Sequence, residues 1–158
     1  VVIKMNKNYR PNVGIMIIDN NKNIFVGQRL DHPSHFWQMP QGGIDANEKP
    51  FDAALREAFE ETGIKKNNLK LISEIKEWYH YDLPLDLAKT LWNGKYIGQK
   101  QKWFLFEFSG NDKDINVNTK DAEFSEFKWV DKKFLINNIV PFKKKIYEKL
   151  LLEFEEFL

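Results

Sequence analysis

Three glutamates share one face of a predicted helix. Glu57, Glu60 and Glu61 lie three and four residues apart, a spacing that stacks side chains on the same side of an α-helix. Like charges at this spacing repel each other by roughly 0.2–0.5 kcal/mol per pair, so a protein that collects them usually neutralises them. Because the chain contains no cysteine, the carboxylates point to a hard divalent cation: Mg²⁺, Mn²⁺ or, less favourably, Ca²⁺. The alternative is an ordinary solvated face, because glutamate favours helices and is mostly exposed.

Glycines and a proline mark the ends of this helix. Gly42 and Gly43 permit positive φ angles and therefore a tight turn that brings the backbone close to a ligand. Pro50 fits the first helical turn, and Gly63 suits the left-handed residue that follows a helix. At about 100° per residue, the buried stripe of the helix is predicted to contain Phe51, Ala54, Leu55, Ala58 and Thr62.

The whole stretch resembles the Nudix box, G-x5-E-x7-R-E-U-x-E-E-x-G-U, in which U is aliphatic. The matching positions are Gly42, Glu48, Arg56, Glu57, Glu60, Glu61, Gly63 and Ile64. Ala58 departs from the pattern, because it is smaller than the usual aliphatic residue. From its place at the entry to the helix, Glu48 either joins the other carboxylates or pairs with Arg56.

Stretches outside the box extend the resemblance to one branch of the Nudix hydrolases, the bacterial RNA pyrophosphohydrolases, also called dinucleoside polyphosphate hydrolases or invasion-associated protein A. They lie at residues 9–14, 37–43, 97–104, 122–124 and 141–143. The resemblance implies an α/β (α+β) Nudix fold, with a mixed β-sheet sandwiched between α-helices. It also implies cleavage of 5′-triphosphorylated RNA to the 5′-monophosphate, with release of pyrophosphate or orthophosphate, and hydrolysis of Ap4A-like dinucleotides.

The resemblance further implies roles for individual residues. It places more than one Mg²⁺, with Mn²⁺ as a possible substitute, on Gly42, Glu57, Glu60, Glu61 and Glu123. Glu57 would also be the general base, while Arg56 and Glu48 would hold the loop to the helix. Gly43 and Gly63 would be structural. Contacts with the RNA end would come from Arg10, Arg29, Tyr81, Gln99, Phe142 and Lys143.

The residues themselves add one pair and leave two alternatives open. Lys100 and Lys102 carry charges that would help Arg10 to hold phosphates. One alternative function is a nucleotide- or RNA-binding module that keeps the scaffold without hydrolysis. The other is hydrolysis of a small nucleoside diphosphate derivative, because pocket specificity cannot be derived from one chain.

Length and composition limit the class of protein. With 158 residues, we expect a tail at residues 1–8 and a single domain over residues 9–158. Lys and Arg total 24 against 23 Asp and Glu, so no bulk charge favours DNA or a membrane. No apolar run approaches the roughly 18 residues of a membrane helix. The absence of cysteine fits a reducing compartment, which favours a cytoplasmic protein; the oligomeric state is left open.

Hydrophobic periodicity predicts the elements that position these residues. Strands are expected at 13–18 and 24–26, joined by a turn at 19–23, and again at 71–81, 98–108 and 123–130. A short helix is expected at 131–138 and a longer one at 141–158. Residues 27–41 are interpreted as a polar connection and residues 85–98 as an irregular excursion.

Overall fold

The computed structural model describes residues 8–31 and 35–158, so the predicted N-terminal tail lies almost entirely outside the described residues. The strands are β1 (Tyr9–Ile18), β2 (Ile24–Arg29), β3 (Trp37–Gln38), β4 (Gln41–Gly43), β5 (Leu69–Glu74), β6 (Tyr79–Asp82), β7 (Gly98–Phe108) and β8 (Phe124–Val130). The α-helices are α1 (Pro50–Thr62), α2 (Leu85–Thr90), α3 (Lys132–Asn137) and α4 (Lys144–Glu153). None of these helices is long and apolar enough to cross a bilayer.

The described strands form one mixed sheet around the long pair β1 and β7. These two strands run parallel from the pair Tyr9–Gly98 to the pair Ile18–Glu107. The other pairings are antiparallel: β2 and β4 flank β1, β5 and β6 flank β7, and β3 and β8 flank β2. The N-terminal half of β1 thus lies between β7 and the glycine-containing strand β4.

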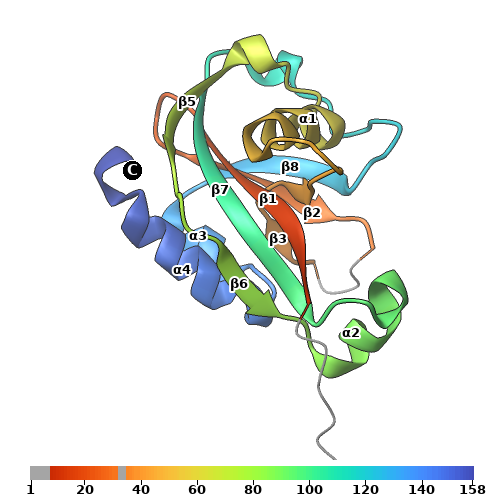
Figure 1. Ribbon diagram of the computed structural model, residues 1–158. Helices are drawn as coiled ribbons and strands as arrows, with labels where there is room; N and C mark the ends of the chain where they lie inside the picture. Colours follow the sequence, from red (N-terminus) through yellow and green to blue (C-terminus); the bar gives the residue numbers. More distant parts are fainter. Residues whose placement is uncertain (1–7, 32–34) are drawn as a thin grey trace, which may run out of the picture.

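Helices cover both faces of the sheet (Figure 1). Because side chains alternate along a strand, β1 and β7 contribute to two separate cores. On one face Ile15 and Phe106 pack in the same cluster as Ala54 of α1. On the other face Trp103 packs with Tyr147 and other residues of α4. The predicted mixed sheet between helices is confirmed.

Helix α1 has the predicted ends, and its buried stripe is confirmed at Ala54, Ala58 and Thr62 but not at Phe51 and Leu55. It begins at Pro50, and Gly63 adopts φ 71° while its N–H donates to the carbonyl of Phe59. Phe51 is 38% exposed, whereas Ala53 and Glu61 are buried. The small alanines let the helix lie close to the sheet, so the side of the helix that carries them is buried. Phe51 lies at the edge of this contact, where its ring still packs against Phe104 and Phe106.

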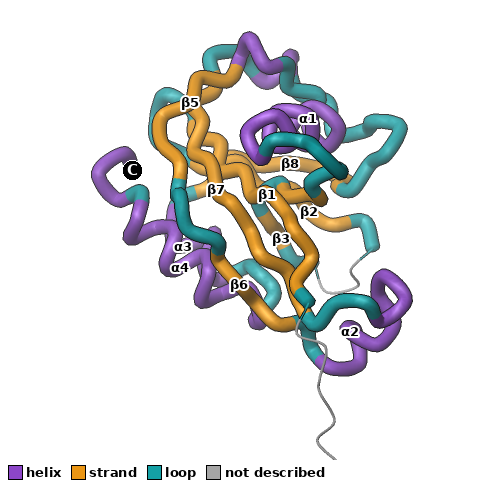
Figure 2. The backbone as a smooth tube through the Cα atoms, in the orientation of Figure 1, coloured by secondary structure: helices purple, strands orange, loops and turns teal. Residues whose placement is uncertain are grey.

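Four other expectations need correction (Figure 2). The polar connection at 27–41 contains the end of β2, all of β3 and the start of β4, and the strand predicted at 71–81 is interrupted between β5 and β6. The segment at 85–98 contains α2 and a 3₁₀ turn. It is helical because Leu87, Ala88 and Leu91 pack against the core. The last helix begins with a 3₁₀ turn at Pro141–Lys143, and α4 ends at Glu153.

Candidate active site

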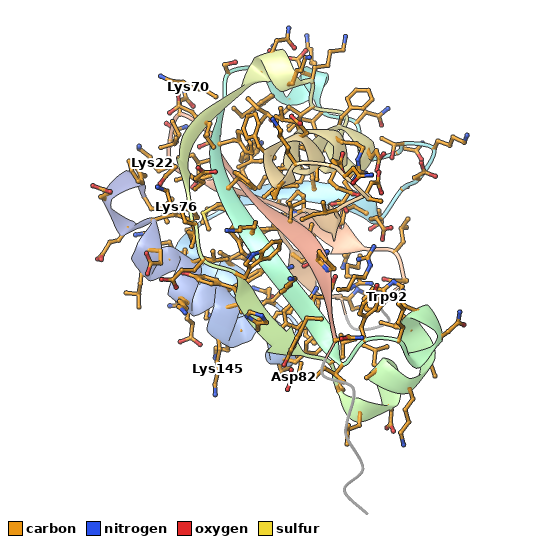
Figure 3. The ribbon with its side chains drawn as sticks, viewed as in Figure 1. Lys22, Lys70, Lys76, Asp82, Trp92 and Lys145 are labelled. Carbon is orange, nitrogen blue, oxygen red and sulfur yellow. The ribbon has the colours of Figure 1, made fainter. Side chains whose placement is uncertain are left out.

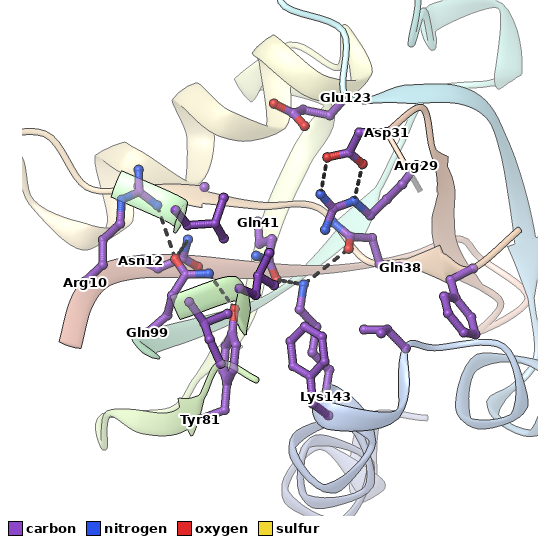
Figure 4. Close-up of a pocket in the computed structure, with 18 of the residues that line it drawn as sticks. Arg10, Asn12, Arg29, Asp31, Gln38, Gln41, Tyr81, Gln99, Glu123 and Lys143 are labelled. Carbon is purple, nitrogen blue, oxygen red and sulfur yellow. Dashed lines mark hydrogen bonds and ion pairs between the residues drawn. The ribbon is translucent and has the colours of Figure 1, made fainter. Parts of the chain in front are cut away.

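A cavity of about 490 Å³ collects side chains from distant parts of the chain (Figure 4). Most of the predicted site residues line it: Arg10, Arg29, Gly42, Gly43, Glu57, Glu61, Tyr81, Gln99, Glu123, Phe142 and Lys143. Four predicted residues do not: Glu48, Arg56, Glu60 and Gly63. The cavity therefore brings together carboxylates, cations and aromatic rings from both halves of the sequence.

Arg56 ties helix α1 to the loop before it. Its Nη2 donates to the carbonyl of Gly43 at 2.8 Å, and its Nε lies 2.9 Å from Oε2 of Glu48. Its Nη1 lies 2.8 Å from Oε1 of Glu57 and 3.1 Å from Oε2 of Glu60. Of the two arrangements considered for Glu48, the structure has the ion pair with Arg56.

The three box glutamates do not converge on one point. Glu57 and Glu60 turn to Arg56, whereas Glu61 is only 4% exposed and accepts a hydrogen bond from the backbone N–H of Gln41 at 3.2 Å. Within the described part of the chain, no three acidic or histidine side chains are arranged as a metal site. Arg56 therefore contacts two of these glutamates, but its single positive charge is also shared with Glu48.

Burial makes these carboxylates hold their protons more tightly than usual. It raises the pKa of Glu57 to about 7, although the hydrogen bonds from Arg56 act in the opposite direction. It also raises the pKa of Glu61 well above its usual value, and the negative charges of Glu57 and Glu123 add to this effect. The pKa of Glu123 is raised by burial too, against the nearby charge of Arg29. A positive charge at this side of the cavity would lower the pKa values of all three carboxylates.

Gly42 and Gly43 leave room for functional side chains. A Cβ on Gly42 would lie 2.0 Å from Cδ of Glu57, and a Cβ on Gly43 would lie 2.2 Å from Nη2 of Arg10. Neither glycine has a positive φ angle, in contrast to Gly63. The prediction of a tight turn with positive φ was therefore wrong for these residues, which instead lie in the strand β4. Close approach of Glu57 and Arg10 explains the need for glycine at both positions.

Lys143 is a buried cation beside the cavity. It is 4% exposed, and its Nζ donates to Oε1 of Gln38 at 3.3 Å and to Oε1 of Gln41 at 3.2 Å. Burial lowers its pKa to about 7, with a further lowering from Arg29 and an opposing effect from Glu61. Neutral carbonyls are weak partners for a buried ammonium group, so this site favours an anion.

Two arginines mark different parts of the cavity. Arg10 donates from Nη1 to Oε1 of Gln99 at 3.2 Å, and its guanidinium lies 4.7 Å from the ring centre of Trp92, beside α2 (Figure 3). Arg29 forms two hydrogen bonds with Asp31, at 2.8 Å and 2.6 Å. Trp92 was missed in the sequence because it lies in the segment interpreted as irregular.

Buried amides were also missed. Asn12, Gln38 and Gln41 line the cavity, and Gln101, 1% exposed, supports them from β7. Polar side chains in a strand are usually exposed, so nothing in their type pointed to this site. The available signal was the alternation of Gln99, Gln101 and Trp103 on one face of a strand.

Lys100 and Lys102 lie on the other face of β7. They do not line the cavity, and their Nζ atoms lie 4.7 Å and 5.1 Å from the ring centre of Trp78. The prediction that they hold phosphates beside Arg10 is not supported, because alternation along the strand turns them away from Gln99 and Gln101.

Comparisons with known proteins agree with this fold. The NUDIX domain family matches residues 8–150. An RNA pyrophosphohydrolase of Roseobacter denitrificans is 48% identical, covering 95% of this chain and 94% of the relative. One of Rickettsia conorii is 49% identical, covering 95% of this chain and 92% of the relative.

Two solved structures share the fold at low sequence identity. The E. coli dihydroneopterin triphosphate pyrophosphohydrolase has a TM-score of 0.73 at 21% identity, over 93% of this chain and 99% of its own. A C. elegans Ap4A hydrolase has a TM-score of 0.67 at 22% identity, over 95% of this chain and 98% of its own. With the box residues, the family match and the identity to curated relatives, these findings establish that the chain belongs to the Nudix hydrolase family.

Proposed function

We propose that this protein is a divalent-metal-dependent pyrophosphohydrolase that acts on 5′-triphosphorylated RNA and on dinucleoside polyphosphates such as Ap4A. The observation that carries the proposal is one cavity that holds the buried carboxylates Glu57 and Glu61 together with the cations Arg10 and Lys143. A polyphosphate needs both kinds of group: cations for its own charge, and carboxylates for the metal ions that accompany it. The names of the curated relatives support the RNA substrate.

The donor set fits Mg²⁺ or Mn²⁺. Glu57, Glu61, Glu123 and the carbonyl of Gly42 would supply oxygen ligands, because these residues line the cavity, and Glu60 lies beside Glu57 through their shared partner Arg56. Their raised pKa values reflect carboxylates that burial and mutual repulsion disfavour as anions, which a bound cation would reverse. When bound, such ions would neutralise phosphate charge and lower the pKa of the attacking water.

Glu57 is the proposed general base. Its carboxylate lines the cavity, where an ionised carboxylate can take the proton of an attacking water. Glu57 therefore would accept a proton from water, while its hydrogen bond to Arg56 holds the carboxylate in place.

The remaining cavity residues would bind the substrate. Arg10 and Lys143 would contact phosphate oxygens, because both are donors and, among the described residues, they donate to amide carbonyls and not to a carboxylate. Tyr81 and Phe142, whose ring centres are 6.0 Å apart, would offer aromatic surface to a base. Arg29, beside Asp31, would face the same substrate.

The test is product analysis of triphosphorylated RNA, Ap4A and ADP-ribose side by side, with Mg²⁺, with Mn²⁺ and with excess chelator. We expect monophosphorylated RNA and cleaved Ap4A with either metal, and no product with chelator. Binding of RNA or Ap4A without products over hours would instead favour a non-hydrolytic module. Preferential cleavage of ADP-ribose would favour a hydrolase of small nucleoside diphosphate derivatives.

A further inference from the structure

A chain of four side-chain hydrogen bonds crosses the floor of the cavity. Nε1 of Trp103 donates to Oε1 of Gln101 at 3.1 Å, and Nε2 of Gln101 donates to Oδ1 of Asn12 at 2.8 Å. Nδ2 of Asn12 then donates to Oε1 of Gln99 at 2.9 Å, and Nε2 of Gln99 donates to the hydroxyl oxygen of Tyr81. Figure 4 shows the part from Asn12 to Tyr81. The strand pairing builds this chain, because Asn12 lies opposite Gln101 and Tyr81 opposite Gln99.

The direction of this chain is fixed by groups that can only donate. The indole of Trp103 can donate a hydrogen bond but cannot accept one, so it requires the carbonyl of Gln101 as its partner. Each amide then presents its NH₂ group to the next residue, which fixes Asn12 and Gln99 in turn. From the other side, the guanidinium of Arg10 also requires the carbonyl of Gln99. Reversing any amide would place two donors or two acceptors face to face in a buried site.

A second donor-only group fixes Gln41. Its Oε1 accepts from Nζ of Lys143 at 3.2 Å and from Nε2 of Gln101 at 3.3 Å, which occupies both lone pairs of a carbonyl. Its NH₂ group is thereby left as the end of the Gln41 amide that can donate.

The Tyr81 oxygen thus receives an N–H group of Gln99. Its own hydrogen has to point elsewhere, and no hydrogen bond with Tyr81 as donor occurs among the described side chains. Tyr81 lines the cavity, so the cavity is where this hydrogen finds an acceptor. Arg10 and Lys143, which also line the cavity, offer only donors as well.

We propose that Trp103, Gln101 and Asn12 are positioning residues that fix the Tyr81 hydroxyl as a hydrogen-bond donor to the ligand. Together with Arg10 and Lys143, this donor forms a floor that selects a group with acceptors only, the oxyanion of a polyphosphate chain. The inference deepens the proposed function and rests on it for the class of ligand. It assigns a role in ligand selection to residues that do not themselves react.

A double-mutant cycle tests the proposal. The probe is adenosine 5′-(α,β:β,γ-bismethylene)triphosphate with Mg²⁺, in which neither bridge can be hydrolysed, and its affinity is measured by calorimetry. The Asn12→Asp carboxylate only accepts, so it draws the NH₂ group of Gln99 towards itself and turns the carbonyl of Gln99 to Tyr81. Arg10 then exchanges its 3.2 Å contact with that carbonyl for the new carboxylate. The Tyr81 hydroxyl then donates to Gln99 and is lost to the ligand.

We expect Tyr81→Phe to weaken probe binding about tenfold in the natural chain and less than twofold in the Asn12→Asp chain. The added negative charge affects both members of the second pair equally, so the cycle cancels it. An equal loss in both backgrounds would mean that Asn12 acts only as a structural residue, and would overturn the proposal. No loss in the natural chain would overturn it as well.

A second variant keeps the test decisive if Asn12→Asp fails to fold or binds too weakly to measure. Gln101→Met removes the link between Trp103 and Asn12 without adding charge. Arg10 still donates to Gln99 in that background, so we expect Tyr81→Phe to cost less than in the natural chain but more than in the Asn12→Asp chain; an unchanged tenfold cost overturns the proposal. The probe is not hydrolysed, so its binding is measured independently of turnover. If Tyr81 and Asn12 are coupled in probe binding but RNA and Ap4A are not turned over, only the proposed function is contradicted. If they are turned over but the two residues are not coupled, only the role of the hydrogen-bond chain is contradicted.

Discussion

Arg56 and Glu48 form a pair of parallel hydrogen bonds, Nε to Oε2 and Nη2 to Oε1, both at 2.9 Å. The same Nη2 also donates to the carbonyl of Gly43 at 2.8 Å. This fork joins the loop to helix α1, and the hydrogen bond with Glu48 is the largest cause of the raised pKa of Arg56. The two side chains are 27% and 17% exposed, so water screens the pair only in part.

Arg56→Lys should destabilise the fold, because an ammonium group cannot reproduce the planar two-point contact. We expect a loss of about 1–3 kcal/mol in the free energy of unfolding, measured by urea titration. Glu48→Gln should cost less, because Arg56 keeps its hydrogen bonds to Gly43, Glu57 and Glu60. The double variant should cost little more than Arg56→Lys, because the pair between the two residues is lost only once. Additive losses would show that the two residues stabilise the protein separately.

Glu57→Gln should remove most turnover and leave the fold intact. The amide keeps the size of the side chain but cannot accept the proton from water, and general-base catalysis typically contributes about 10²–10⁴-fold. Product release from triphosphorylated RNA at saturating Mg²⁺ measures the effect, with thermal unfolding as the check on folding. Glu126→Gln is the control, because Glu126 is an exposed glutamate on β8. Turnover near the natural rate in Glu57→Gln would exclude this residue as the base.

Gly42→Ala and Gly43→Ala should have different kinetic effects although they are neighbours. The new Cβ at position 42 would meet the carboxyl carbon of Glu57 at 2.0 Å, whereas the one at position 43 would meet Nη2 of Arg10 at 2.2 Å. Displacing the proposed base should lower kcat at least tenfold, and displacing a phosphate ligand should mainly raise KM. Steady-state kinetics of both variants would decide, and the reverse pattern would contradict the assigned roles.

Much of the fold could be predicted from the sequence because its signals are local. Pro50 and Gly63 mark the two ends of α1, and the alternating run at 98–108 coincides with β7. Pairing is not local: no periodicity indicates that Tyr9–Ile18 lies parallel to Gly98–Phe108. The helix α2 was missed for a related reason, because its apolar residues pack against a core that other segments of the chain form.

In the candidate site, too, the local signals could be predicted and the non-local contacts could not. Ionisable and aromatic residues within matched motifs were predicted and line one cavity, Glu57 and Lys143 among them. The buried amides were missed because Asn12 and Gln101 become partners only through the register of β1 and β7. The contacts of Arg56 with both Glu57 and Glu60 also depend on side-chain geometry that spacing on a helix leaves open.

The buried ammonium group of Lys143 should make stability depend on pH. Its pKa falls from an ordinary 10.5 to about 7 in the folded protein. Above pH 10.5 neither folded nor unfolded chain carries this proton. Between about 10.5 and 7 the unfolded chain binds it more, so stability is lost as the pH falls. Below about 7 both states are protonated and the loss is complete, at most roughly 5 kcal/mol.

Lys143→Met should therefore stabilise the ligand-free protein at pH 6–7 and should weaken polyphosphate binding. Urea unfolding from pH 6 to pH 10 measures the first effect as the difference between the two stability curves, which should shrink as the pH rises. The control is Lys144→Met, at an exposed position beside it, which should follow the natural chain. Parallel curves for Lys143→Met and the natural chain would mean that the folded protein holds this lysine with an ordinary proton affinity. The stabilisation would then not come from a buried charge that awaits an anion.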